Sequence, residues 1–100
     1  MEWKDFAGPY KFTPGYDTCV ARATFDGGRR YVAALTLEVE VSEGGKYTAR
    51  AWEPHDSGNS RRGLATVDEA KETAKAMAVE HVNKKLAMLT QAMAELTALT

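Results

Sequence analysis

The sequence predicts an α+β fold in which a three-stranded antiparallel meander packs on one long C-terminal helix. Between Asp17 and Glu53, apolar and polar residues alternate with the period of two that is typical of strands, and glycine-rich segments interrupt this alternation twice. From Thr66 onward there is no glycine or proline, and Ala, Lys, Glu and Met dominate, which favours a helix. The 100 residues suit a single domain, 1–100, with one core.

Residues 1–16 are predicted to form an irregular N-terminal arm, because prolines and glycines recur there. The arm also carries aromatic side chains, which would lose much apolar contact if they stayed in water. We therefore expect these side chains to pin the arm to the body of the domain. They are Trp3, Phe6, Tyr10 and Phe12.

The register of the second hairpin in the segment 17–53 follows from its apolar residues. A two-residue turn at Gly44 and Gly45 would place Arg50 opposite Val39, on the apolar face. A three-residue loop, 43–45, with a glycine in the left-handed conformation keeps the apolar residues together. This solution pairs Val41 with Tyr47, Val39 with Ala49 and Leu37 with Ala51.

The same argument applied to the first hairpin predicts a five-residue loop. It pairs Phe25 with Tyr31, Ala23 with Ala33 and Ala21 with Leu35. The resulting apolar face is rich in alanine, which leaves room for a helix to lie close across it. Its members are Cys19, Ala21, Ala23, Phe25, Tyr31, Ala33, Leu35, Leu37, Val39, Val41, Tyr47, Ala49 and Ala51.

Residues 54–65 are polar and are predicted to form a loop, after which a helix spans 66–98. Thr66 and Glu69 have the spacing of a capping box, which marks the helix start. A helix of this length extends about 50 Å, whereas strands of seven or eight residues reach only about 25 Å. The second half of the helix must therefore extend past the sheet or fold back.

That second half carries an apolar stripe that something must cover, and three alternatives are open. The helix bends near Thr90 and the aromatic arm covers the stripe, or a second copy of the chain covers it, or a foreign partner does. A homodimer through this helix would use Leu86, Leu89, Met93 and Leu96.

Composition excludes several classes of function. The formal net charge of −1 disfavours a protein that depends on phosphate contacts. A single cysteine, Cys19, cannot form an intramolecular disulfide, which suits a reducing cytoplasm. No apolar run approaches the length of a membrane span, and the first residues lack the apolar core of a signal peptide, so we expect a cytoplasmic protein without membrane contact.

No residue pattern indicates catalysis, and the sequence predicts a protein that is not an enzyme and needs neither metal nor cofactor. His55, Asp56 and Ser57 are the residue types of a hydrolase relay, but adjacent residues in one loop cannot point into one another as a relay requires. Cys19 is predicted on the apolar face as an inert thiol. One cysteine and two histidines do not make a zinc site.

The stretch from the second hairpin into the helix resembles the three-stranded-sheet-plus-helix domains of AP2-type plant factors and of the arm-binding domains of mobile-element integrases. The matching positions are Gly45, Lys46, Tyr47, Ala49, Gly63, Thr66, Glu69, Ala70 and Ala74. In those families arginine and tryptophan on the outer sheet face contact DNA, which the resemblance would assign to Arg22, Arg50 and Trp52. The chain departs from the pattern at Glu38 and Glu40, whose carboxylates would repel phosphate.

We therefore expect a small binding protein that blocks or regulates a macromolecular partner, with a protein as the first choice of partner. By size and chemistry it is similar to phage-encoded inhibitors, such as anti-CRISPR proteins, that act on nucleic-acid-handling complexes. The alternative is sheet-face binding of double-stranded DNA, as in the integrase arm domains. Trp and Arg are frequent at interface hot spots, and acidic groups can mimic phosphates in a basic groove. The predicted partner-binding residues are Glu38, Glu40, Arg50, Trp52, Arg29 and Arg30.

Overall fold

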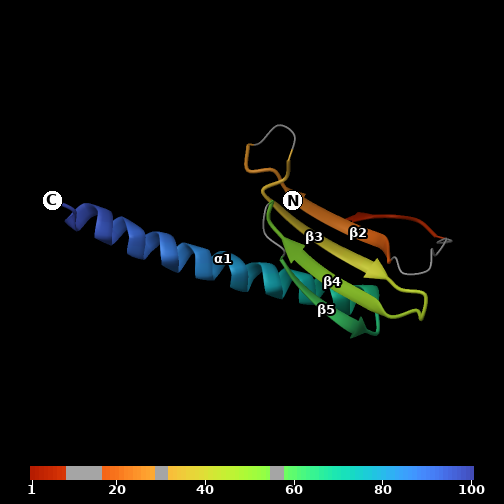
Figure 1. Ribbon diagram of the computed structural model, residues 1–100. Helices are drawn as coiled ribbons and strands as arrows, with labels where there is room; N and C mark the ends of the chain where they lie inside the picture. The colour runs from red at the N-terminus through yellow and green to blue at the C-terminus, as the bar shows by residue number, and fades with distance from the viewer. Residues whose placement is uncertain (9–16, 29–31, 55–57) are drawn as a thin grey trace.

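The computed structural model describes residues 1–8, 17–28, 32–54 and 58–100. A five-stranded antiparallel sheet, in the order β1-β2-β3-β4-β5, carries one C-terminal helix on one face (Figure 1). The predicted α+β class is confirmed, and the predicted meander gains one strand at each edge. The elements are β1 (Lys4–Asp5), β2 (Thr18–Phe25), β3 (Leu35–Val41), β4 (Tyr47–Trp52), β5 (Asn59–Leu64) and α1 (Val67–Ala98).

The hairpin between β3 and β4 has the predicted register, with Val41 opposite Tyr47 and Val39 opposite Ala49. Gly45 adopts a φ of +78°, the left-handed conformation that the three-residue loop requires. The loop closes through a hydrogen bond from the Ser42 backbone N–H to the Lys46 carbonyl oxygen, at 3.0 Å. Glycine placement and the faces of the side chains were sufficient to predict this turn.

The predicted register of the first hairpin is wrong by four residues, because Ala21 pairs with Val39 and Phe25 with Leu35. A longer connection, from 26 to 34, replaces the five-residue loop and begins with Asp26 accepting a hydrogen bond from the Gly28 N–H at 2.9 Å. The observed register lets β3 pair along its length with β2 as well as β4, which satisfies its backbone groups on both sides. Tyr31 lies outside the described residues.

Two edge strands were missing from the prediction. β5 forms within the predicted 54–65 loop and pairs with β4, but its side chains are almost all exposed, so it lacks the alternation that indicates a strand. Backbone hydrogen bonds to β4 hold most of it in place, and Leu64 packs against the core. At the other edge, two residues of the predicted arm form β1 against β2.

The core lies between the sheet and the first half of α1. Ala70, Ala74 and Ala78 are buried and face the sheet residues Ala49 and Ala51, which are buried as well. Because none of these side chains extends beyond Cβ, the helix approaches the sheet closely, as the alanine-rich face predicts. Helix α1 packs across β3, β4 and β5.

A β-bulge in β2 changes which face Cys19 occupies. The register shifts between Cys19 and Ala21, so Cys19 lies opposite Glu40 and Val20 is buried in its place. The prediction that Cys19 lies on the apolar face is therefore wrong. The cause is the extra residue, which inverts the alternation on one side of the bulge.

Helix α1 is continuous from Val67 to Ala98 and begins as predicted. The Thr66 side chain accepts a hydrogen bond from the Glu69 N–H, and the Glu69 carboxylate accepts one from the Ala65 N–H. No break occurs at Thr90, whose hydroxyl donates to the Leu86 carbonyl oxygen within the helix. The alternative in which the helix breaks near Thr90 and folds back is therefore wrong, because α1 continues through this residue to Ala98.

The described part of the arm lies along β2 and contacts the first half of α1, so it does not cover the second half. Trp3 packs against the core, and Lys71 of α1 lies 5.5 Å from the centroid of its ring. Lys71 also pairs with Asp5 at 2.8 Å. The second half of α1 extends away from the sheet, which gives the molecule principal extents of 60 × 28 × 23 Å (Figure 1).

Within the described ranges, no helix combines the length and the apolar character that crossing a membrane requires.

Candidate protein-binding surfaces

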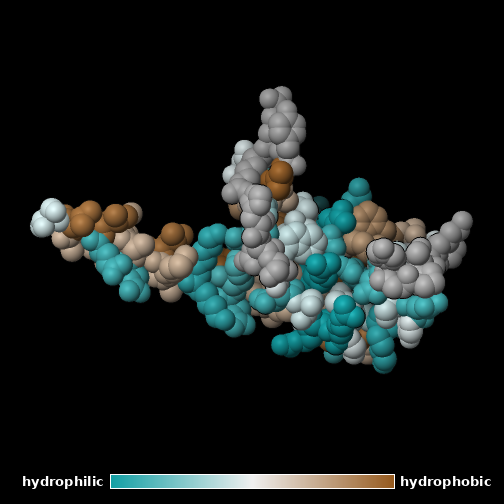
Figure 2. All heavy atoms as spheres, in the orientation of Figure 1, coloured by the Kyte–Doolittle hydropathy of each residue, from teal (hydrophilic) through white to brown (hydrophobic). Residues whose placement is uncertain are grey.

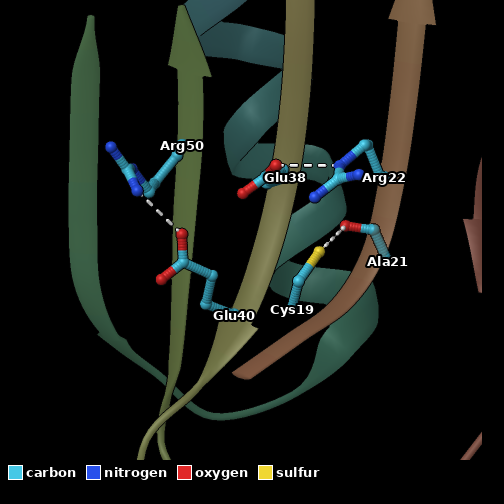
Figure 3. Close-up of polar contacts among 6 residues, drawn as sticks. All are labelled: Cys19, Ala21, Arg22, Glu38, Glu40 and Arg50. Atoms are coloured by element: carbon cyan, nitrogen blue, oxygen red, sulfur yellow. Dashed lines mark hydrogen bonds and ion pairs between the residues drawn. The ribbon is translucent and has the colours of Figure 1, made fainter. Parts of the chain in front are cut away.

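The face of the sheet opposite α1 carries two ion pairs that share the central strand β3 (Figure 3). The Arg22 Nε of β2 donates to Glu38 Oε1 at 2.8 Å, and the Arg50 Nη1 of β4 donates to Glu40 Oε1 at 2.9 Å. Glu38 does lie opposite Arg50 in the register, as predicted. The predicted cross-strand pair between them is nevertheless replaced, because each arginine reaches a different glutamate.

An aromatic ring backs each of the two arginines. The Arg22 guanidinium lies 5.9 Å from the centroid of the Phe6 ring, and the Arg50 guanidinium lies 5.1 Å from that of Trp52. Trp52 is in turn packed against the backbone at Gly58, where a Cβ would come within 2.5 Å of the Trp52 Cβ. The two arginines are thus held between a carboxylate and a ring, which reduces the rotamer freedom that binding would remove.

The carboxylates lie beneath the arginines. The Glu38 side chain is only 9% exposed and that of Glu40 12%, whereas those of Arg22 and Arg50 are 45% and 42% exposed. Burial raises the pKa of Glu38, and the charge and hydrogen bond of Arg22 oppose that rise only in part. This outer sheet face therefore presents arginine and aromatic surface, with its negative charge underneath. Glu38 and Glu40 are poorly placed to mimic phosphate.

Cys19 belongs to the same face. Its Sγ donates to the Ala21 carbonyl oxygen at 3.5 Å, and the side chain is partly buried. Burial, together with the nearby Glu38 carboxylate, raises the pKa of the thiol. A raised thiol pKa disfavours the thiolate and with it nucleophilic reactivity, in agreement with the interpretation as an inert thiol.

The second surface is an apolar seam along α1, which we define as Val79, Val82, Leu86, Leu89, Met93 and Leu96. These six side chains are between 46% and 64% exposed. Hydrophobic side chains gather on the part of the helix that projects from the sheet (Figure 2). The four residues predicted for self-association all lie in this seam, and Val79 and Val82 extend it towards the sheet.

Where α1 leaves the sheet, the seam opens into an apolar notch of about 250 Å³. Phe25, Ala34 and Leu35 form one wall, and Val82, Leu86 and Leu89 form the other. Phe25 is 54% exposed here, although the sequence predicts it in the buried face. It lies at the end of β2, beyond the part of the sheet that the helix covers.

Glu53, which follows β4, fixes the helix at this point. It accepts a hydrogen bond from Lys85 Nζ at 2.7 Å, and its other oxygen lies 3.2 Å from His81 Nε2. The hydrogen bond from Lys85 lowers the pKa of Glu53. Burial opposes this effect in part, and His81 lowers the pKa further. The direction in which α1 leaves the sheet is therefore set by the contacts of Glu53 with Lys85 and His81 and by the apolar contacts in the notch.

Several residues that the sequence analysis singled out fall outside the described ranges. Arg29 and Arg30 lie outside the described residues, as do His55, Asp56 and Ser57. Among the residues that the structure describes, no group of three or more His, Cys, Asp or Glu side chains is arranged to hold a metal ion.

Two residues of the surfaces, Phe6 and Val79, were missed at the sequence level. Phe6 was assigned to the arm, and only its place beside β1 brings it over Arg22. Val79 carries a signal that could have found it, because residues 79–96 repeat apolar positions at alternating intervals of three and four.

Comparison with protein-family models, with curated proteins and with solved structures finds no match for this chain. The resemblance to AP2 and integrase arm-binding domains therefore stays a prediction.

Proposed function

We propose that this protein is a non-enzymatic binding protein, and that the apolar seam of α1 is the surface by which it holds another protein. The observation that carries the proposal is the exposure of the six seam residues on a helix that projects from its own sheet. Monomeric soluble proteins rarely leave contiguous apolar surface of this kind uncovered, and such surface marks contact sites.

The stability of the helix itself supports the same proposal. Past Lys85, thirteen residues of α1 have no sheet beneath them, apart from the notch contacts of Leu86 and Leu89. Most of the stability of a helix in a protein comes from the packing of its apolar face, and this part of α1 has little such packing within one chain. A partner that covers the seam would therefore stabilise the projecting half of the helix as well as bury its apolar side chains.

The outer sheet face is a second contact surface in this proposal, through which the protein would block or regulate a target. Arg22, Arg50 and Trp52 are residue types enriched at binding hot spots, and the ion pairs to Glu38 and Glu40 hold both arginines in place. We propose inhibition by occupancy of a surface on a larger complex, the mode predicted from the similarity in type to phage-encoded inhibitors.

The seam is tested by site-specific photo-crosslinking in extracts of its native cells. A photoreactive residue replaces Leu89 or Met93 in the seam, or Ala87 or Ala94 as matched controls on another side of the same helix. We expect protein adducts at 89 and 93 well above those at 87 and 94. Equal yields at all four positions would refute the proposal.

The DNA-binding alternative is tested separately with a mobility-shift assay. Because Arg22 and Arg50 already donate to carboxylates, we expect no retention of duplex DNA even at low salt. Retention that weakens steeply with salt would favour the sheet-face DNA binder instead.

A further inference from the structure

We infer that the apolar seam binds the seam of a second copy of this chain, with the two helices antiparallel. The inference rests on the proposed function, since it names the occupant of that surface. From Val79 to Leu96 the six seam residues follow one another at alternating intervals of three and four residues. This is the spacing of the two core positions in a coiled coil, which two helices of the same sequence can share.

An antiparallel arrangement brings every seam residue onto an apolar counterpart. A two-fold axis between Ala87 and Met88 places Val79 beside the partner's Leu96, Val82 beside the partner's Met93 and Leu86 beside the partner's Leu89. The partner helix then crosses the notch beside Phe25 and Leu35, so the same contact covers the surface of the sheet that α1 leaves open.

The charges flanking the seam favour the antiparallel orientation over the parallel one. Lys75 occupies the next position of the same spacing, one step before Val79, and is exposed. Parallel helices would bring Lys75 opposite the partner's Lys75. In the antiparallel arrangement it lies beside the end of the partner's α1, whose last turn carries no basic residue to offset the negative end of the helix dipole.

The remaining flanking positions place no like charges together in this register. Asn83 lies near the partner's Thr90, and Lys85 lies near the partner's Ala92. Burying the exposed parts of the six side chains on each helix, together with the notch, would remove about 1,100 Å² from water, close to the lower end of specific interfaces. The chain thus carries enough matching apolar surface for a dimer without any other protein.

The first test is the mass of the purified full chain in solution by light scattering coupled to size exclusion. We expect twice the chain mass of 11.0 kDa, and one chain mass for the variant Leu89→Glu/Met93→Glu. The variant Ala87→Glu/Ala94→Glu adds the same charge on another side of the helix and should stay dimeric. Circular dichroism of both variants checks that they fold.

The second test fixes the orientation through disulfide formation in a Cys19→Ser background. Val79→Cys and Leu96→Cys chains, mixed and oxidised, should give a mixed crosslinked dimer. Each alone should give almost none, because like positions of antiparallel helices would stand about 25 Å apart, far beyond the reach of a disulfide. Efficient crosslinking of Val79→Cys with itself would instead show a parallel pair and overturn the proposed orientation.

The outcomes separate this inference from the proposed function. A mass of one chain at every concentration overturns the second copy as occupant. If photo-crosslinks at positions 89 and 93 then join a different protein, the seam is still a binding surface and the proposed function stands. If the chain is monomeric and the crosslinks show no preference for the seam, both fail.

Discussion

At the residue scale, the sequence places the charged residues of the outer sheet face correctly but does not predict which of them form ion pairs. Glu38 faces Arg50 in the register, yet it pairs with Arg22 while Arg50 pairs with Glu40. Sequence alternation assigns a residue to a face, but the choice among several oppositely charged neighbours depends on side-chain reach and local twist. The face was therefore predictable, and its pairing was not.

Replacing Glu38 by Gln should change the stability at neutral pH by no more than about 1 kcal/mol, because the Arg22 side chain is 45% exposed and can be solvated when the pair is lost. The raised pKa of Glu38 means that the fold favours its protonated form. The associated stability is present at low pH and is lost as pH rises through that pKa. Urea unfolding of Glu38→Gln and wild type at pH 7 checks this, and a loss of several kcal/mol would contradict it.

Glu53 should have the opposite pH dependence. Its pKa lies below the ordinary value of 4.5, so its contribution to stability is present above about pH 4.5 and is lost as pH falls through the lowered pKa. The variant Glu53→Gln should lack this acid-side loss when unfolding is measured from pH 7 to pH 3. Glu43→Gln, at the exposed hairpin tip, is the control and should follow wild type.

Gly58 is required both by conformation and by space. Its φ is +69°, and an added Cβ would lie 2.5 Å from both the Ala51 carbonyl oxygen and the Trp52 Cβ. We expect Gly58→Ala to cost about 2 kcal/mol or more in urea unfolding. Gly44→Ala, which would meet no atom within 4 Å, should be close to neutral. Equal effects of the two substitutions would show that the contact at Gly58 is unimportant.

At the element scale, prediction succeeded where a turn or a cap has a specific chemistry. Gly45, with its left-handed conformation, determined the loop of the second hairpin. The capping box of Thr66 and Glu69 marked the start of α1. It failed at the first hairpin because a shift by any even number of residues leaves the faces unchanged, and only the pairing of β3 with both neighbours selects among such shifts. It also missed β5, whose exposed side chains carry no periodic signal.

The close contact between α1 and the sheet depends on side-chain size. Ala74 is fully buried against the sheet, whereas Ala76, two residues along, is exposed. Ala74→Leu should destabilise the protein by about 1–3 kcal/mol through overpacking, and Ala76→Leu should have little effect. Thermal and urea unfolding of the two variants compares the same substitution on two sides of one helix. Similar stabilities would contradict the packing described.

At the scale of the whole molecule, most contacts of α1 with the sheet lie between Val67 and Lys85, and most of the exposed seam lies beyond Lys85. The buried helix residues end at Ala78, and Lys85 makes the last ion pair with the sheet side. The sequence predicted the mismatch in length between helix and sheet, because both lengths follow from residue counts. It left open what covers the seam, because covering depends on surfaces outside one chain.

A chain ending at Lys85 should therefore keep the folded sheet while losing four of the six seam residues, Leu86, Leu89, Met93 and Leu96. We expect its circular dichroism to retain the strand signal, and its mass to be that of one shortened chain. Denaturant unfolding of the shortened chain checks that the core survives. Loss of cooperative unfolding would show that the projecting half of α1 contributes to folding rather than to binding.

The continuity of α1 also has a geometric consequence. Because one rigid rod joins the sheet to the seam, the separation and relative angle of two outer sheet faces in a paired molecule are set by residue count alone. Inserting one alanine between Lys85 and Leu86 would advance the distal part by about 1.5 Å and rotate it by about 100° around the axis. A target that contacts both outer sheet faces of such a pair would need two binding sites with the same separation and relative angle.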